Sequence, residues 1–239
     1  AADLVQDARR HDVRHLHIHS CANAAHLGAL AQIIGDLPYS LTLHGDLPVY
    51  GVDHAAKMAR ARFVAAVTRP LAQQIAEVSP ATDAPVIWMG VDCDRFRPAA
   101  RPANAIFTIA TVARLNHMKG HRYALGAMAM LRDRGISVRY RIAGDGPDRA
   151  QIEEEVARLR LSDQVQMTGA LGEADILTLL HAADALVLSS FGQGEAAPVT
   201  VMEAMACGLP VICSRIGGTP DMITDGVDGF LVEQRDIEG

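Results

Sequence analysis

Short runs of apolar, mostly β-branched residues alternate with longer helical patterns along almost the whole of this 239-residue chain. This alternation constrains the fold more than any other feature, because strands joined through helices pair in parallel with right-handed connections. Strands of such sheets are covered on both faces and are continuously apolar, as Ala185–Leu188 and Pro210–Cys213 are. The sequence therefore predicts an α/β fold.

The expected strands in the first part of the chain are Val13–His19, Ser40–His44, Phe63–Val67 and Val86–Trp88. Those in the second part are Phe107–Val112, Val138–Ala143, Val165–Thr168, Ala185–Leu188, Pro210–Cys213 and Gly229–Val232. Helical patterns fill the gaps, at Ala24–Ile34, Pro70–Val78, Arg122–Arg134, Arg149–Leu159, Ala174–Ala182 and Val199–Ala206.

A break in composition falls at Asp92–Asn104, a segment rich in arginine and proline that is typical of a linker. We therefore expect two domains, residues 1–98 and residues 99–239. Open parallel sheets bind their ligands beyond the carboxyl ends of the strands, so functional residues are expected in the loops that follow strands.

Charge and cysteine usage exclude several classes of protein. A net charge of −6 argues against non-specific binding to nucleic acid. No apolar stretch reaches the length of a membrane span, although a peripheral association with a membrane stays open. The cysteines form no CxxC pair, which argues against a zinc cluster or a disulfide framework and favours the cytoplasm; they are Cys21, Cys93, Cys207 and Cys213.

The segment Ser189–Val232 contains the richest pattern. A glycine-containing loop ends in Glu195, and the helix that follows carries Glu203. One interpretation of Glu203 is simply a carboxylate that complements a helix N-terminus. The other is that two carboxylates beside free backbone N–H groups suit a ligand with both hydroxyls and phosphates, which is the chemistry of a nucleotide sugar.

This segment resembles the carboxyl-terminal signature of glycosyltransferase family 4, retaining enzymes of the GT-B fold. Glu195 and Glu203 match the family's E-x7-E pattern, and the motifs EAMACGLPVI, GG-x-P and DG-x-x-G-F-L-V around and after them match as well. TVARLNHMKG places Arg114 and Lys119 after a strand, as the family does, and RIAGDGPDR matches a family strand that ends in GDGP. The resemblance implies two Rossmann-like domains with parallel sheets and a cleft between them.

The resemblance also implies site residues. Arg114 and Lys119 would bind the diphosphate, and Glu195, the third expected catalytic residue, would hold the donor sugar. Residues 1–98 would form part of an acceptor-side domain, and residues 99–239 the donor-binding domain. The other expected contacts with the nucleotide sugar are Glu203 at the ribose, the backbone of Val199 and Thr200, Leu171 near the base, and Gly144 of the GDGP motif.

In the first part, His44 and Asp46 follow an expected strand, where the family places residues that face the cleft on the acceptor side. A packed core histidine is an equal alternative for His44. His17 and His19 share one strand face, and we interpret them as packing residues or acceptor-side lining rather than metal ligands.

Asp92 and Asp94 form a D-x-D pattern, which holds a divalent metal in a different glycosyltransferase fold. The resemblance to the family's interdomain segment explains both aspartates, so we expect no metal site. No cofactor is expected either, because the nucleotide diphosphate sugar is a co-substrate.

The resemblance thus implies a metal-independent, retaining glycosyltransferase of hexosyltransferase type that acts in polysaccharide or glycoconjugate synthesis. Its partners would be a nucleotide-sugar donor and a sugar or lipid-linked acceptor, without nucleic acid. The alternatives are a non-catalytic nucleotide-sugar-binding module, or an epimerase or phosphorylase of the same fold. The abrupt ends, AADLVQ and RDIEG, favour a fragment that lacks the start of its first domain and a closing helix.

Overall fold

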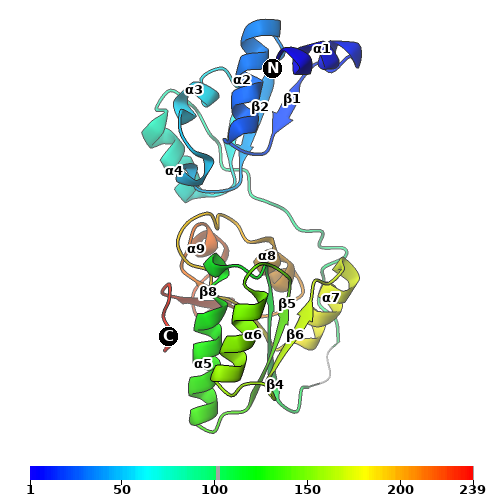
Figure 1. The fold of residues 1–239 in the computed structure, drawn as a ribbon, viewed down its shortest axis with the longest axis vertical. Helices are drawn as coiled ribbons and strands as arrows, with labels where there is room; N and C mark the ends of the chain where they lie inside the picture. The colour runs from blue at the N-terminus through cyan, green and yellow to red at the C-terminus, as the bar shows by residue number, and fades with distance from the viewer. Residues whose placement is uncertain (101–102, 239) are drawn as a thin grey trace. The chain divides into compact units, whose positions relative to one another are not determined.

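The computed structural model describes residues 1–100 and 103–238; Arg101 and Pro102 of the expected linker, and Gly239, lie outside the described residues. The chain forms two compact units, drawn as ribbons in Figure 1. The first unit contains Ala1–Met89 together with Gln193–Ala197, and the second contains Gly90–Gly192 and the residues from Pro198 onward. No helix among the described residues combines the length and the apolar character needed to cross a membrane.

The first unit is built on a parallel sheet with the strand order β1-β2-β3. Its strands are β1 (Leu16–Ile18), β2 (Tyr39–Leu43) and β3 (Val64–Ala66). Its helices are α1 (Ala2–Arg10), α2 (Asn23–Gly35), α3 (His54–Met58) and α4 (Arg69–Val78), with a 3-10 turn at Leu47–Tyr50. The apolar side chains of β2 and β3 pack with those of α4 in one core cluster.

One expected strand of this unit is wrong. The segment Val86–Trp88 forms only a single bridge, between Val86 and Ala66. Ala66 is the last residue of β3, so a strand that starts to pair there has no partner further along the sheet.

The second unit is built on a six-stranded parallel sheet with the order β6-β5-β4-β7-β8-β9. Its strands are β4 (Phe107–Val112), β5 (Val138–Ala143), β6 (Val165–Gly169), β7 (Ala185–Leu188), β8 (Val211–Ser214) and β9 (Gly229–Val232). Its helices are α5 (His121–Asp133), α6 (Arg149–Arg158), α7 (Glu173–Ala182), α8 (Val199–Ala206) and α9 (Thr219–Met222), with a 3-10 turn at His117–Lys119.

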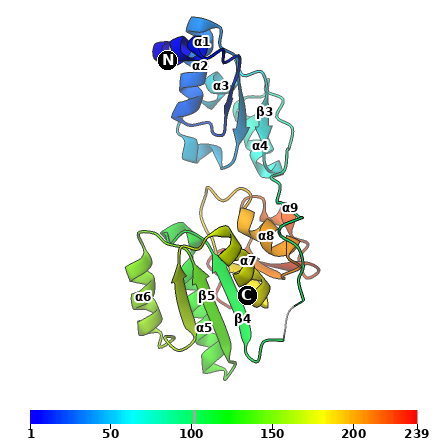
Figure 2. The same cartoon turned by 90° about the vertical axis from the view of Figure 1, so that its right-hand side faces the viewer.

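Helices cover both faces of this sheet (Figure 2). α5 and α6 pack on one face, in a cluster around Leu125, Tyr140 and Ile152. α7 and α8 pack on the other face, in a cluster around Leu180 and Val201. Burial on both faces explains why these strands are continuously apolar.

The strand order reverses between β4 and β7. β4 is first in the sequence of this unit, β5 and β6 extend the sheet on one side, and β7 to β9 extend it on the other. In open α/β sheets such a switch point opens a crevice at the carboxyl ends of the strands, and this crevice is the usual ligand site. The loops that border it here follow β4 and β7.

Candidate functional site

A cavity of about 350 Å³ opens at the carboxyl ends of β4, β5 and β6. We call it the β4–β6 cavity. Three of the residues expected to bind the nucleotide sugar, Arg114, Gly144 and Leu171, line it together. The rest of its lining is mainly small or apolar and consists of Val112, Ala113, Ala143, Asp145, Ala170 and Ile176. Asp145 is the acidic residue of this lining, and its carboxylate accepts a hydrogen bond from the Gly146 N–H (2.8 Å). Apolar walls with the Arg114 cation beside them suit a planar ring attached to an anionic group.

Lys119 lies in the same loop as Arg114, at the end of the 3-10 turn His117–Lys119. Asn116 accepts a hydrogen bond from the Lys119 backbone N–H through its side-chain oxygen (3.2 Å), and this bond closes the 3-10 turn. The Arg114 side chain is exposed and makes no ion pair within the described residues. Two cations five residues apart in one loop can neutralise an anionic ligand that reaches both.

The loop after β7 holds this turn in place. The single proton of the Ser189 hydroxyl is shared between the carbonyl oxygens of Lys119 (3.3 Å) and Gly120 (3.0 Å). The Phe191 N–H donates to the carbonyl oxygen of Met118 (2.9 Å). The turn that carries Lys119 is therefore tied to the strand on the other side of the switch point.

Gly144 has a structural reason to be glycine. Its φ of +149° is an angle that side chains rarely adopt, and a Cβ atom there would lie 1.8 Å from the Ala113 carbonyl oxygen. The segments that follow β4 and β5 thus touch through their backbones, directly before Arg114. This close approach explains the glycine without a contact to phosphate.

His121 supports Arg114 from the protein interior. The ring is 3% exposed, and its Nε2 lies 3.2 Å from the Arg114 carbonyl oxygen. A carbonyl can only accept, so Nε2 must carry the proton and donate. Burial lowers the pKa of His121, while the bond to the Arg114 carbonyl acts in the opposite direction.

α8 carries three of the expected residues. Val199 and Thr200 form its first turn, and Pro198 at its N-cap makes no side-chain cap, so the first N–H groups have no side-chain partner there. The Thr200 hydroxyl is buried and has no partner within the described residues. Burial raises the pKa of the Glu203 carboxyl, and the nearby Glu173 carboxylate raises it further. Such a carboxylate is poorly solvated and would gain from hydroxyl groups that donate to it.

Glu195 lies on the segment Gln193–Ala197, which packs as part of the first unit. Ala196 of this segment is buried in the core of that unit. The Gly194 N–H donates to one carboxylate oxygen of Asp46 (2.8 Å), and the Gln74 amide donates to the other (2.8 Å). Asp46 therefore anchors the segment that carries Glu195, and both of its oxygens are engaged.

His44 follows β2 and pairs with a second histidine. Its Nε2 lies 3.0 Å from Nδ1 of His19, and the two rings stack. Burial lowers the pKa of His44, and His19 and His17 lower it further. His17 is held by the Ser40 hydroxyl, 2.8 Å from its Nδ1.

The D-x-D pattern forms a local turn. The Asp92 carboxylate accepts from the backbone N–H groups of Asp94 (3.0 Å) and Arg95 (3.2 Å). These two bonds to the backbone give the Asp92 carboxylate a structural role in the turn, which fits the interpretation of this segment as a linker.

Sequence reasoning missed two residues at the site, Ser189 and His121. Ser189 directly follows a predicted strand, which is a usable signal for a loop residue at the ligand edge. His121 acts on a backbone carbonyl seven residues before it, and no spacing of residue types encodes such a contact.

The second unit is thus an open α/β sheet with a switch point, and it has a cavity with a cation beside it at the carboxyl ends of its strands. The chain belongs to the glycosyl transferases group 1 family, whose sequence model matches residues 94–239. This match and the structural relatives confirm the predicted family and the GT-B fold.

Relatives with similar sequences are glycosyltransferases by name, in agreement with this family. The chain is 36% identical over 154 residues to the putative colanic acid biosynthesis glycosyltransferase WcaL of Escherichia coli. This match covers 62% of the chain and 38% of WcaL. It is 32% identical over 155 residues to glycogen synthase of Mycobacterium tuberculosis, with 64% of this chain and 37% of that protein covered. The chain thus spans about two fifths of the length of these relatives.

Solved structures match more of the chain at lower identity. Anabaena Alr3699/HepE in complex with UDP-glucose superposes with a TM-score of 0.84 at 22% identity, over 99% of this chain and 69% of that one. Sucrose-phosphate synthase from Thermosynechococcus elongatus also gives 0.84, at 23% identity, over 98% of this chain and 64% of that one.

Proposed function

We propose that the protein transfers a sugar from a nucleotide diphosphate sugar to an acceptor hydroxyl, with retention of the anomeric configuration. The observation that carries the proposal is the β4–β6 cavity, where Arg114, Gly144 and Leu171 meet at the edge at which an open parallel sheet binds its ligands. The complexes of Alr3699/HepE with UDP and with UDP-glucose support the same ligand class for this chain.

Arg114 and Lys119 would bind the diphosphate. In the reaction the bond from the anomeric carbon to the diphosphate oxygen breaks, and a bond from that carbon to the acceptor oxygen forms on the same face. Negative charge grows on the leaving diphosphate, so two cations beside it stabilise the transition state more than the ground state. An oxygen of the leaving diphosphate takes the acceptor proton. With both cations supplied by side chains, the proposed reaction needs no metal ion.

The start of α8 would add to the diphosphate site. Its backbone N–H groups at Val199 and Thr200 favour an anion, and the buried Thr200 hydroxyl is a further donor without a partner in the described structure. Glu203, whose carboxylate is poorly solvated, would accept from the ribose hydroxyls. Glu195 would accept from the hydroxyls of the donor sugar.

On the acceptor side we propose His44 and Asp46. His44 is held by its pairing with His19 and would face the acceptor. Both carboxylate oxygens of Asp46 accept hydrogen bonds, so its contribution would be to order the segment that carries Glu195.

The biological setting is proposed from the relatives. WcaL is named for colanic acid biosynthesis and AmsK of Erwinia amylovora for amylovoran biosynthesis, which supports a role in polysaccharide or glycoconjugate synthesis. The acceptor we propose is a sugar or a lipid-linked sugar. All four cysteines are free thiols, which supports the cytoplasm as the compartment.

Proton NMR of the reaction with a UDP-sugar tests the proposal. We expect an α-linked donor to give an α-linked product. Inversion at the anomeric carbon would refute retention. Epimerised donor without transfer would favour an epimerase, transfer to inorganic phosphate a phosphorylase, and tight UDP binding without any turnover a binding module.

A further inference from the structure

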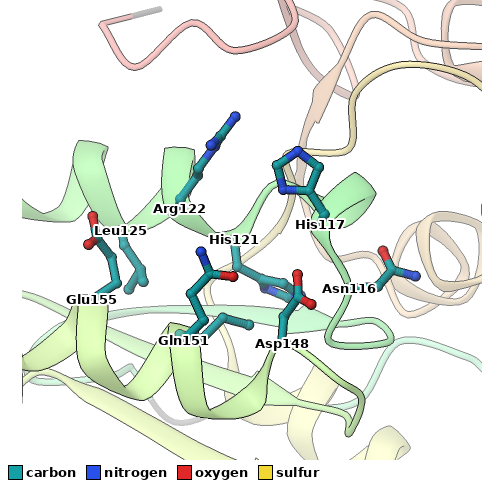
Figure 3. Close-up of a pocket in the computed structure, with 9 residues that line it drawn as sticks. Asn116, His117, His121, Arg122, Leu125, Asp148, Gln151 and Glu155 are labelled. Carbon is teal, nitrogen blue, oxygen red and sulfur yellow. The ribbon is translucent and has the colours of Figure 1, made fainter.

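The second unit contains another pocket, of about 260 Å³, between α5 and α6 (Figure 3). We call it the α5–α6 pocket. It shares no lining residue with the β4–β6 cavity, so it is not part of the proposed nucleotide site. Its polar lining consists of Asn116, His117, His121, Arg122, Asp148, Gln151 and Glu155.

His121 brings an unsatisfied acceptor to this pocket. Its Nε2 donates to the Arg114 carbonyl, and burial lowers the pKa of the ring, which favours the neutral form of His121. In a neutral ring the second nitrogen can only accept. That atom, Nδ1, is buried and has no hydrogen-bond partner within the described residues. A buried acceptor without a donor is costly, so a group that donates to Nδ1 should bind here.

Asp148 supplies a second acceptor. It lies at the N-cap of α6, where an aspartate usually caps the helix through its side chain, but no such bond forms. Its backbone N–H donates to the Leu115 carbonyl (3.0 Å), while its carboxylate lines the pocket. Figure 3 shows the side chains of Asp148 and His121 turned toward the same space.

Donors complete the lining. Gln151 contributes an amide that can donate as well as accept, and Arg122 lines the pocket while its guanidinium donates to the Tyr123 hydroxyl (2.6 Å). The carboxylates of Asp148 and Glu155 disfavour an anionic ligand, and that of Glu155 is already paired with Arg158 (2.6 Å). The Arg122 charge disfavours a cation. A neutral molecule with several hydroxyl groups matches both the donors and the acceptors of the lining, because each hydroxyl group donates and accepts. A volume just below the usual range for drug-sized ligands fits a single ring.

We propose that the α5–α6 pocket is a second ligand site, which takes one neutral sugar ring by hydroxyl contacts to His121 and Asp148. The ring can be a free monosaccharide or the end of a longer saccharide. Since His121 also bonds to the Arg114 carbonyl, an occupant of the pocket would affect the position of the loop that carries Arg114. An effect on sugar transfer through this loop rests on the proposed function, whereas the existence of the site does not.

The test follows the imidazole nitrogens of His121 by NMR while the chain is titrated with glucose, galactose, mannose or N-acetylglucosamine, and with maltotriose as a longer saccharide. We expect at least one probe to shift the Nδ1 signal saturably. Asp148→Ala should weaken that binding about tenfold or more, because it removes a charged acceptor. Gln151→Ala, an exposed substitution, should weaken it less, and Glu154→Ala, on the same helix but outside the pocket, should leave it unchanged.

The proposal is overturned if no probe shifts the His121 signal, or if Asp148→Ala in a folded chain binds as tightly as the wild type. Displacement of the sugar by excess UDP would also overturn it, since the sugar would then occupy the nucleotide cavity. Binding of the monosaccharides alone assigns the site to a free sugar, and equal binding of maltotriose assigns it to a chain end. UDP affinity, measured separately, reports on the proposed function, so the two ideas can fail independently.

Discussion

Substitution of Gly144 by alanine should destabilise the second unit by several kcal/mol. The backbone angle of +149° alone costs a side chain about 1–3 kcal/mol. The new Cβ would lie 1.8 Å from the Ala113 carbonyl oxygen, and ordinary contact begins near 3.4 Å, so the two segments must separate by about 1.6 Å. Such a shift costs about 1–3 kcal/mol and strains the bond from the Ala113 N–H to the Ala143 carbonyl, worth about 1 kcal/mol. The total is about 3–7 kcal/mol.

Gly135→Ala is the matched control. Gly135 also has a positive φ, +76°, but nothing lies within 4 Å of its added Cβ, so only the backbone penalty of about 1–2 kcal/mol remains. Urea unfolding followed by circular dichroism compares the variants, and calorimetry compares their affinity for UDP. We expect Gly144→Ala to lose both stability and UDP affinity, and Gly135→Ala to keep its affinity. Equal losses of stability in the two variants would show that the contact with Ala113 is not what requires glycine.

Four other predictions concern the proposed chemistry. Arg114→Ala and Lys119→Ala should each reduce transfer roughly ten- to a hundredfold in steady-state kinetics, since a bond to a charged group is worth about 1.5–3 kcal/mol, while Arg134→Ala at the other end of α5 should not. Because burial raises the pKa of Glu203, the folded chain should gain stability as the pH falls from neutral through that raised pKa. In thermal unfolding, Glu203→Gln should flatten this pH dependence and raise stability at neutral pH. The same variant should bind UDP more weakly. Glu195→Ala should leave the calorimetric affinity for free UDP nearly intact and reduce transfer; an equal loss of UDP affinity in both glutamate variants would contradict the split between sugar and ribose. EDTA should not change the rate of transfer, and a loss that manganese restores would revive the D-x-D site.

Much of the fold could be predicted because buried parallel strands are visible in the sequence as short apolar runs. All six expected strands of the second unit are present, with ends that shift by one residue at most, since burial on both faces leaves a continuous apolar run in the sequence. Val86–Trp88 shows the limit of this signal: the run is apolar, but its pairing stops where β3 ends, and β3 lies 20 residues away in the sequence. Local composition does not encode the length of a neighbouring strand.

The candidate site likewise has residues that the sequence predicts and contacts that it does not. The resemblance to known motifs singled out Arg114, Gly144 and Leu171, and the structure brings them to one cavity. The contacts of Ser189 and His121 with the turn between Arg114 and Lys119 could not be predicted, because they end on backbone carbonyls, which every residue has. Only the folded chain decides which carbonyl lies within reach.

These backbone contacts explain why the edge of the sheet, rather than its interior, contains the most demanding positions. At Gly120 a Cβ atom would lie 1.9 Å from the Ser189 carbonyl oxygen, just as one at Gly144 would meet Ala113. The loops after β4, β5 and β7 therefore touch main chain to main chain on either side of Arg114 and Lys119. Contacts of this kind leave the backbone that carries the two cations little freedom to shift, so this backbone needs little reorganisation when charge develops on a ligand. The glycines of this edge thus serve the proposed chemistry through rigidity, and a side chain at either one would disturb it without touching a ligand.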